Sequence, residues 1–329
     1  MPAYRNLYIE RAAAGHPNGQ ALLERHGSRP VVWIDSYSEV FYRAGQDFQE
    51  QKRAPALVAA LADGPLLYEA PTRVCGVHDM PVFYNDQLRN CVYNCDYCFL
   101  QGMHPSGHTL VFVNSEAFHE AAARRAKDGP FWLSISYLTD ILAFEPVLPI
   151  VSEWVAFARR TPEVTVEIRT KGEAPDFVRG DPVANVVLIW SLSPPAVAGR
   201  YERGCASFEN RVLAARTAAE RGWRVRIAVD PVILHPGWAT NYAEMLSALS
   251  ARVEPESVEA ATYGVFRVGA DFMGRMSAAR ADSPILHHPF DRADRVSTYS
   301  AREIDAIHQA VGGPLREWLG PQKLTFVHG

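Results

Sequence analysis

Residues 91–101 read CVYNCDYCFLQ, and this stretch decides what kind of protein the 329-residue chain is expected to be. Cys91, Cys95 and Cys98 are closely spaced in it, and Tyr97 stands directly before the last thiol. Structural zinc sites usually take four ligands from two separated Cys-x2-Cys pairs, but the other two cysteines of the chain stand alone. Ferredoxin-type clusters use four thiolates. With only three thiolates, one iron of such a cluster would have no protein ligand. Catalytic metal sites keep an open coordination position of this kind.

The overall composition is that of an ordinary globular protein. Hydrophobic residues make up 48% and charged residues 21% of the chain. The net charge of −4 gives no global attraction to nucleic acid, so contact with a polyanion would need a local basic face. No long apolar run predicts a membrane span, and no secretory signal is visible. We therefore expect a cytoplasmic protein without a membrane partner, in which clustered thiols hold metal or do chemistry.

From about residue 80 the chain alternates apolar runs with helical segments. The runs are rich in β-branched residues and are continuous rather than alternating, which predicts strands covered on both faces. They lie at 80–86, 130–136, 164–171, 183–193, 225–234 and 258–268. About six β/α units in succession predict an α/β fold, with a parallel sheet curled into a partial (β/α)6 TIM-type barrel.

The chain is expected to have three parts. Residues 1–79 would form an N-terminal extension packed on the barrel, with a polar helix around 47–62. Residues 80–270 would be the barrel core. Residues 271–329 would form a C-terminal segment that caps the substrate side and ends in a helix and a last strand at 323–329.

The cysteine segment resembles that of the radical S-adenosylmethionine (SAM) superfamily, where an aromatic residue also precedes the third cysteine of a Cys-x3-Cys-x2-Cys loop. This resemblance implies that Cys91, Cys95 and Cys98 hold a [4Fe–4S] cluster. It also implies that SAM chelates the open iron and is cleaved to methionine and a 5′-deoxyadenosyl radical. The partial barrel of that superfamily agrees with the strand and helix count.

Within the superfamily, the chain resembles the spore photoproduct lyase family of DNA-repair enzymes. CDYCFLQ is similar to the family's C-x-Y-C-Y-L-Q segment, and VVLIWSLSPP (186–195) to its Phe-Ser-Ile-Asn strand. The run from 209 to 242 resembles a helix, a strand and an I-H-x-G-W-x-x-x-Y motif. The likeness covers roughly residues 80–270. It implies a lyase-type enzyme, damaged DNA as a partner, and an electron donor of the flavodoxin or ferredoxin type.

The resemblance assigns SAM-binding roles to residues at strand ends. Thr139 and Asp140 stand where the family has a Ser-Asp pair that contacts SAM. Lys171 matches a lysine near the SAM carboxylate, and Ser191 matches a serine on the ribose side. Each has a simpler alternative: Asp140 as a cap of the next segment, Lys171 as a solvent-facing side chain, and Ser191 as a capping serine.

Two tyrosines receive catalytic roles from the same resemblance. Tyr97 matches a tyrosine that would shield the cluster edge or belong to a radical relay, although an aromatic that only packs the loop is an equal alternative. Tyr137 stands where the family has the cysteine that returns a hydrogen atom to the product radical. A phenol O–H can donate a hydrogen atom, but tyrosine is also a common barrel-lining residue. Cys205 is expected either to reach the barrel mouth or to be buried as a small hydrophobe.

Other positions add expectations or depart from the family. Phe99 replaces a second tyrosine, which removes a hydroxyl from the relay. Glu209 and Arg211 match a motif in which we expect a structural ion pair. The family's basic C-terminal run is replaced, so a phosphate-facing patch would have to come from scattered arginines; the candidates are Arg267, Arg275, Arg280, Arg292 and Arg295.

Three functions therefore stay open. The first is a radical SAM enzyme that repairs a thymine lesion or a related damaged base in DNA, for which an aromatic-lined mouth is expected. The second keeps the radical chemistry but acts on a small molecule, a peptide or an RNA, and Tyr137 in place of the donor cysteine favours it. The third is a non-catalytic iron–sulfur binding or sensing protein, which would have no use for Asp140, Lys171 and Ser191 at successive strand ends.

Overall fold

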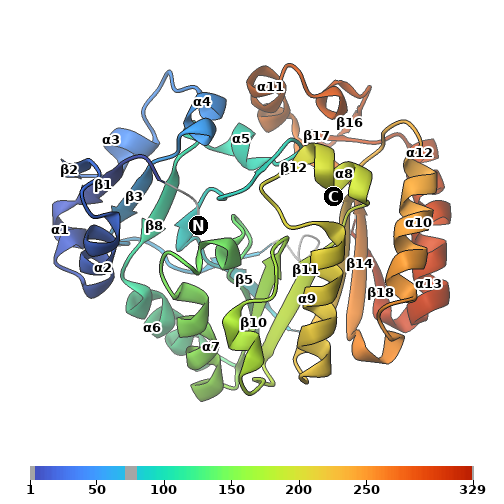
Figure 1. Cartoon of the computed structure of the whole chain (residues 1–329), viewed down its shortest axis with the longest axis horizontal. Helices are drawn as coiled ribbons and strands as arrows, with labels where there is room; N and C mark the ends of the chain where they lie inside the picture. Colours follow the sequence, from blue (N-terminus) through green and yellow to red (C-terminus); the bar gives the residue numbers. More distant parts are fainter. Residues whose placement is uncertain (1–3, 71–79, 328–329) are drawn as a thin grey trace.

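The computed structural model of the protein describes residues 4–70 and 80–327. Figure 1 shows two curved sheets with most helices on their outer sides. The larger sheet has eight strands in the order β18-β14-β13-β11-β10-β9-β5-β4. Their bounds are β4 (Tyr68–Glu69), β5 (Val82–Tyr84), β9 (Phe131–Ser134), β10 (Val164–Thr170), β11 (Val186–Ser191), β13 (Arg224–Val232), β14 (Ala260–Val265) and β18 (Leu324–Val327).

The strands from β5 to β14 lie side by side in chain order and pair in parallel. At the edges, β18 adds in parallel to β14, and β4 pairs antiparallel with β5. Every residue of β9 and β11 is buried, as expected for strands covered on both faces. The predicted partial (β/α)6 barrel and the expected last strand are confirmed.

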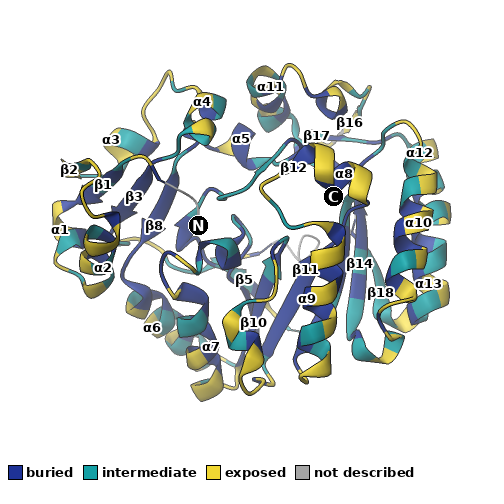
Figure 2. Ribbon diagram, viewed as in Figure 1, coloured by how far each residue is buried: buried dark blue, intermediate teal, exposed yellow. Residues whose placement is uncertain are grey.

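The helices outside the barrel each bury one face. They are α6 (Ser115–Ala126), α7 (Ile150–Arg160), α9 (Phe208–Glu220), α10 (Trp238–Ser250), α12 (Ala301–Ile307) and α13 (Gly313–Leu319). In α7 the buried Ile150, Trp154 and Ala158 recur every four residues, so they share one face of the helix. Figure 2 shows buried strands and exposed outer helix faces, which places the core between the two layers.

The smaller sheet joins the expected N-terminal extension to the segment that carries the cysteines. Its five strands have the order β2-β1-β3-β8-β6. They are β1 (Leu7–Glu10), β2 (Val31–Ile34), β3 (Leu57–Ala60), β6 (Leu88–Arg89) and β8 (Thr109–Phe112). Only β6 is antiparallel to its neighbour. This sheet therefore contains strands from both sides of the expected boundary at residue 79.

The helix expected around 47–62 is much shorter in the structure. It is α4 (Phe48–Arg53), which begins at Asp47, whose carboxylate accepts a hydrogen bond from Glu50 N–H at 2.9 Å. It ends at Ala54 because the following Pro55 disfavours a helical conformation at the preceding residue. The apolar residues after the proline form β3 instead.

The remaining elements connect the sheets and cover the strand ends. The helices are α1 (Arg11–Ala14), α2 (Pro17–His26), α3 (Ser38–Phe41), α5 (Leu100–Met103), α8 (Pro195–Tyr201) and α11 (Ala270–Ala279). Two short strands, β7 (Asn94–Cys95) and β12 (Glu202–Arg203), pair with each other. A three-stranded sheet contains β15 (Arg267–Gly269), β16 (Asp291–Ala293) and β17 (Val296–Thr298). Within the described ranges, no helix has the length and apolar character to cross a membrane.

Candidate functional site

One cavity of about 500 Å³ collects the residues that the sequence nominates. It lies against the cysteine loop and the carboxyl ends of the barrel strands, where barrel sites are usually built. All nine nominated residues line it: Cys91, Cys95, Tyr97, Cys98, Tyr137, Thr139, Asp140, Lys171 and Ser191.

The loop with the three cysteines is held by hydrogen bonds at its start. Asn90 adopts a left-handed backbone conformation with φ of 67°, which asparagine tolerates better than most residues. Its buried side-chain amide donates to the carbonyls of Ser106 at 2.7 Å and His108 at 2.9 Å. The Thr139 hydroxyl donates to the Asn90 carbonyl at 3.1 Å, and Lys52 donates to the Cys91 carbonyl. Thr139 thus fixes the loop from the neighbouring strand end.

The three thiols have the chemistry that an iron–sulfur cluster requires. All three are free and half-buried, and burial raises the pKa of Cys91 to about 12 and of Cys98 to about 11. Iron binding would therefore have to displace protons. Among the described residues, no three His, Cys, Asp or Glu side chains converge as a site for a single metal ion. A [4Fe–4S] cluster would tie each thiolate to a different iron, so it would not require the three thiols to converge on one ion.

Asp140 joins the ends of two strands. It is buried, and its carboxylate accepts hydrogen bonds from Lys171 N–H at 2.7 Å and from the Thr170 hydroxyl at 3.0 Å. It also caps the following turn by accepting from Ala143 N–H at 3.2 Å. Burial raises its pKa, and these hydrogen bonds limit the rise. The capping role considered as the alternative is present, and the same carboxylate also lines the cavity.

Tyr97 and Lys171 both lie near the buried carboxylate of Glu202. The Tyr97 hydroxyl donates to Glu202, and the Lys171 ammonium lies 5.9 Å from the centre of the Tyr97 ring. Burial lowers the pKa of Lys171, but nearby negative groups, of which Glu202 contributes most, together outweigh burial and leave that pKa above its ordinary value. Lys171 is therefore a half-buried cation at the cavity wall. Tyr97 packs the loop through its ring and holds it through its hydroxyl.

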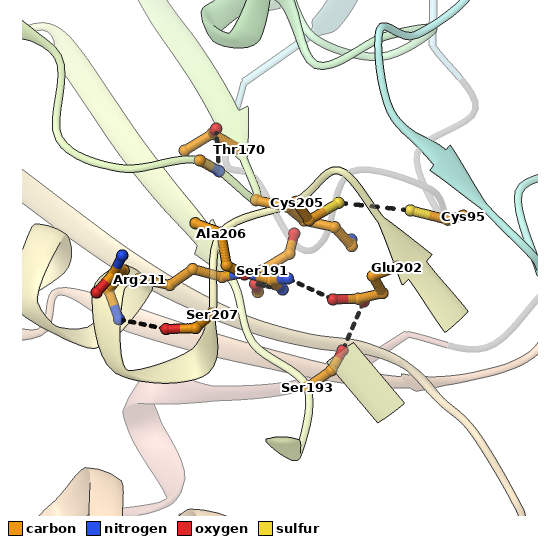
Figure 3. A network of polar contacts seen from close by, with 12 residues as sticks. Cys95, Thr170, Ser191, Ser193, Glu202, Cys205, Ala206, Ser207 and Arg211 are labelled. Carbon is orange, nitrogen blue, oxygen red and sulfur yellow. Dashed lines mark hydrogen bonds and ion pairs between the residues drawn. The ribbon is translucent and has the colours of Figure 1, made fainter. Parts of the chain in front are cut away.

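Glu202 is the centre of a network that Figure 3 shows. Its carboxylate accepts from Arg211 at 2.5 Å and from the Ser193 hydroxyl at 2.8 Å. Arg211 also donates to the carbonyl of Ser191 at 3.0 Å and to that of Ala206 at 2.9 Å. The side chains of Glu202 and Arg211 are both fully buried. The network therefore positions the end of β11, where Ser191 lines the cavity.

The ion pair expected in this region has a different partner. Arg211 pairs with Glu202, whereas Glu209, two residues before it on α9, lies exposed on the helix surface. The reason is geometric, because residues two apart on a helix point in different directions. Glu202 itself was missed because it lies in a two-residue strand without a recognisable pattern.

Cys205 lies beside the cysteine loop, in a contact that its position in the sequence did not indicate. Its Sγ is 3.7 Å from the Sγ of Cys95, so it has a partner thiol in the fold although none is near in the sequence. It is half-buried rather than part of the apolar core. Cys75 lies outside the described residues.

The cavity lining contains both aromatic and charged side chains. Tyr137 is one of the aromatic residues in this lining, and its ring lies 4.4 Å from that of Tyr84 behind it, which stacks on Tyr68 at 5.2 Å between ring centres. The charged residues of the lining include both signs close together. Arg267 forms two hydrogen bonds to Asp230, at 2.8 and 3.1 Å, and Arg169 lies 4.0 Å from the same carboxylate.

The five arginines considered as candidates for a phosphate-facing patch do not all face solvent. Arg280 is buried and pairs with Asp96 at 2.8 Å, and Arg275 donates to the carbonyl of Gly102. Arg267 is engaged by a carboxylate inside the cavity. Arg275, Arg292 and Arg295 are exposed, and Arg295 pairs with Asp271 at 3.0 Å. Two of the five arginines, Arg267 and Arg280, therefore act inside the fold.

Comparisons with known proteins agree on one family. A family model described as spore photoproduct lyase matches residues 83–269. The spore photoproduct lyase of Geobacillus sp. (strain Y412MC61) is 24% identical over 258 residues, which cover 75% of this chain and 73% of the relative. That of Bacillus subtilis (strain 168) is 20% identical over 259 residues, which cover 77% and 74%.

Solved structures show the same fold. A mutant spore photoproduct lyase with bound AdoMet and dinucleoside spore photoproduct aligns with a TM-score of 0.82 at 17% identity, covering 99% of this chain and 98% of the other. A spore photoproduct lyase complexed with dinucleoside spore photoproduct gives the same TM-score, identity and coverage. At this identity the likeness establishes the fold.

Proposed function

The chain belongs to the spore photoproduct lyase family, and from this premise we propose that it is a radical SAM enzyme that repairs a thymine lesion or a related damaged base in DNA. The observation that carries the proposal is the shared cavity. Three free thiols on one loop face the same space as Asp140, Lys171 and Ser191 from successive strand ends. A protein that only stored or sensed a cluster would not need these groups.

In this proposal Cys91, Cys95 and Cys98 hold a [4Fe–4S] cluster, which supplies the electron for reductive cleavage of SAM when it is bound. Lys171 is half-buried and charged, so its ammonium can neutralise the carboxylate of SAM without first taking up a proton. Asp140 holds the main chain at Lys171 in place, and Ser191 adds a hydroxyl to the same cavity lining. Free thiols persist in a reducing compartment, so we propose a cytoplasmic location and a flavodoxin- or ferredoxin-type electron donor.

Tyr137 is our proposed hydrogen-atom donor to the product radical. It lines the cavity beside the strand ends and is held against Tyr84. In this step the phenol O–H bond breaks and a C–H bond forms on the substrate carbon, which leaves a tyrosyl radical. The phenol therefore takes over the step that the family assigns to a cysteine.

The cavity suits a neutral, flat and polar group such as a nucleobase. Its lining includes Tyr137 and other aromatic rings on which a base can stack, and Asp230 and Arg267 in the same lining neutralise each other. A phosphate would find little net positive charge inside. We therefore propose that damaged DNA places its base in the cavity and keeps its backbone outside.

The decisive experiment uses anaerobically reconstituted protein with SAM, dithionite and a synthetic dinucleotide spore photoproduct. We expect both thymidine dinucleotide and 5′-deoxyadenosine by liquid chromatography and mass spectrometry. Cys91→Ala should abolish the cluster and all SAM cleavage. Retained cleavage in that variant would contradict the proposed cluster site.

A second candidate keeps the radical chemistry on another substrate, and the phenol at position 137 favours it. Production of 5′-deoxyadenosine without thymine recovery would select this candidate. Neither product, from protein with an intact cluster, would favour an iron–sulfur binding or sensing protein.

A further inference from the structure

A fourth thiol lies next to the cysteine loop, outside the three-cysteine motif. The Sγ of Cys205 is 3.7 Å from the Sγ of Cys95, close enough for a hydrogen bond between sulfur atoms. Figure 3 shows the two side chains pointing toward each other from separate segments of the chain. No role in the proposed reaction uses this contact.

The backbone on both sides fixes the contact. Cys95 lies on β7, which pairs antiparallel with β12 so that Cys95 faces Glu202 in the register. After β12 the chain turns back through Gly204, whose φ of 87° favours glycine. The turn closes when Cys205 N–H donates to the Glu202 carbonyl at 3.1 Å. The turn thereby places the Cys205 side chain beside that of Cys95.

Two further anchors keep this turn in place. Ala206 N–H donates to the carbonyl of Lys171 at 3.0 Å, which ties the turn to the end of β10. Below it, the Glu202 carboxylate is clamped by Arg211 and Ser193. These hydrogen bonds therefore hold the turn that carries the Cys205 thiol in one position.

We propose that Cys205 is a positioning residue whose thiol donates an S–H···S hydrogen bond to the cluster-bound sulfur of Cys95. This inference rests on the proposed function, because it requires the cluster. As a ligand, Cys95 is a thiolate without a proton, so it can only accept, and the proton in the contact belongs to Cys205.

The consequence is a change in reduction potential. Reduction adds negative charge to the cluster and its sulfur ligands, and a hydrogen bond to a ligand sulfur favours the more negative state. Cys205 thus makes the one-electron reduction easier. Because it contacts a ligand sulfur, it leaves the iron position for SAM open.

The test compares the midpoint potential of the anaerobically reconstituted full chain with those of Cys205→Ala and Cys205→Ser. Each is titrated with dithionite and followed by electron paramagnetic resonance, with iron and sulfide content measured alongside. We expect Cys205→Ala to lower the ratio of reduced to oxidised cluster about threefold to tenfold at a fixed solution potential, which is a shift of about 30 to 60 mV. Cys205→Ser should retain the wild-type potential because its hydroxyl also donates.

Two results would overturn the inference while leaving the proposed function intact. One is an equal potential in all three proteins at equal iron content. The other is loss of iron in Cys205→Ala, which would make Cys205 a ligand. If the unmodified chain binds no iron–sulfur cluster, the proposed function itself fails, and the inference falls with it.

Discussion

Glu202 shows how one buried carboxylate orders several groups around the cavity. It accepts hydrogen bonds from Tyr97 on the cysteine loop, from Ser193 after β11 and from Arg211 on α9. Burial raises its pKa, but the charges of Lys171 and Arg211, together with the hydrogen bonds from Tyr97 and Arg211, outweigh burial and leave that pKa below its ordinary value. Glu202 therefore stays charged and balances the fully buried Arg211 and the half-buried Lys171.

We predict that Glu202→Gln destabilises the whole fold. Arg211 is fully buried, so removal of its partner leaves an uncompensated charge, which typically costs about 3–5 kcal/mol. Urea unfolding followed by circular dichroism should show this loss. Ser193→Ala is the matched control, because it removes one hydrogen bond from an uncharged donor to the same carboxylate and should cost less, about 1.5–3 kcal/mol. Equal stability of the two variants would refute the charge argument.

The Tyr137→Phe variant tests whether the Tyr137 hydroxyl donates the hydrogen atom, separately from the packing of the Tyr137 ring. The ring remains able to pack on Tyr84, so SAM cleavage should continue. Thymine recovery should be lost, because phenylalanine has no O–H hydrogen atom to donate to the product radical. Product analysis of both species checks this. Tyr84→Phe removes a hydroxyl one ring away and should keep thymine recovery; equal losses in both variants would point to packing instead.

The sequence predicts which residues come together when a polar or charged side chain stands at the end of a recognisable strand. Asp140, Lys171 and Ser191 follow apolar runs that are readable as strands, and parallel strands bring their carboxyl ends to one edge. Glu202 and Cys205 could not be found this way. They reach the site through β7 and β12, which have two residues each and therefore show no periodicity.

At the scale of elements, the contact between α5 and α11 supports the cysteine loop from outside the barrel. Gly102 on α5 faces Phe272 on α11 so closely that an added Cβ would lie 2.5 Å from the Phe272 carbonyl oxygen and 2.8 Å from its Cβ. Both obstacles are backbone or near-backbone atoms, so they cannot move alone. The glycine therefore sets the distance between the two helices.

Gly102→Ala should push α11 away from α5. We expect a loss of about 1–3 kcal/mol in the free energy of unfolding, as for other overpacked contacts, together with weaker iron loading. Gly274→Ala, on α11 itself, is the control. An added Cβ there meets nothing within 4 Å, so alanine should stabilise the helix by up to about 1 kcal/mol. The measurements are the free energy of unfolding, from denaturant curves, and the iron content of both variants.

The far side of the barrel carries a pH-dependent link between β13 and the segment before β14. Glu259 accepts from Arg224 at 2.6 Å and from Arg226 at 2.9 Å. Burial raises the pKa of Glu259, but the two arginines outweigh burial and lower it below its ordinary value. The stabilisation is therefore present above the unfolded-state pKa of about 4.3 and is lost as pH falls through the lower folded-state pKa.

Glu259→Gln should consequently lower the free energy of unfolding by about 1 kcal/mol at neutral pH, a modest amount because the pair is partly exposed. The difference from wild type should vanish in acid. Unfolding curves between about pH 3 and pH 7 measure it. Glu256→Gln, at an exposed position nearby, should leave the pH dependence unchanged. A difference that persisted in acid would exclude the ion pairs as its origin.

At the scale of the whole molecule, the N-terminal residues belong to the site as much as to their own sheet. β3 pairs with β8, whose residues are all buried, and β8 leads from the cysteine loop to α6. From α4, Lys52 donates to the Cys91 carbonyl, and Gln49 donates to the Gln101 side chain at 3.1 Å. The expected division at residue 79 therefore crosses contacts that hold the proposed cluster loop.

A chain that begins at residue 80 should fail as a separate unit. Its β8 would expose an unpaired edge with buried apolar residues, which is a typical cause of aggregation. It would also lack the Lys52 contact to the cysteine loop. We expect a low soluble fraction and little iron after reconstitution, and co-expression of residues 1–79 as a separate chain should restore both in part. Soluble, monomeric protein with a full cluster from residues 80–329 alone would instead mean that the first 79 residues are an independent addition to the barrel.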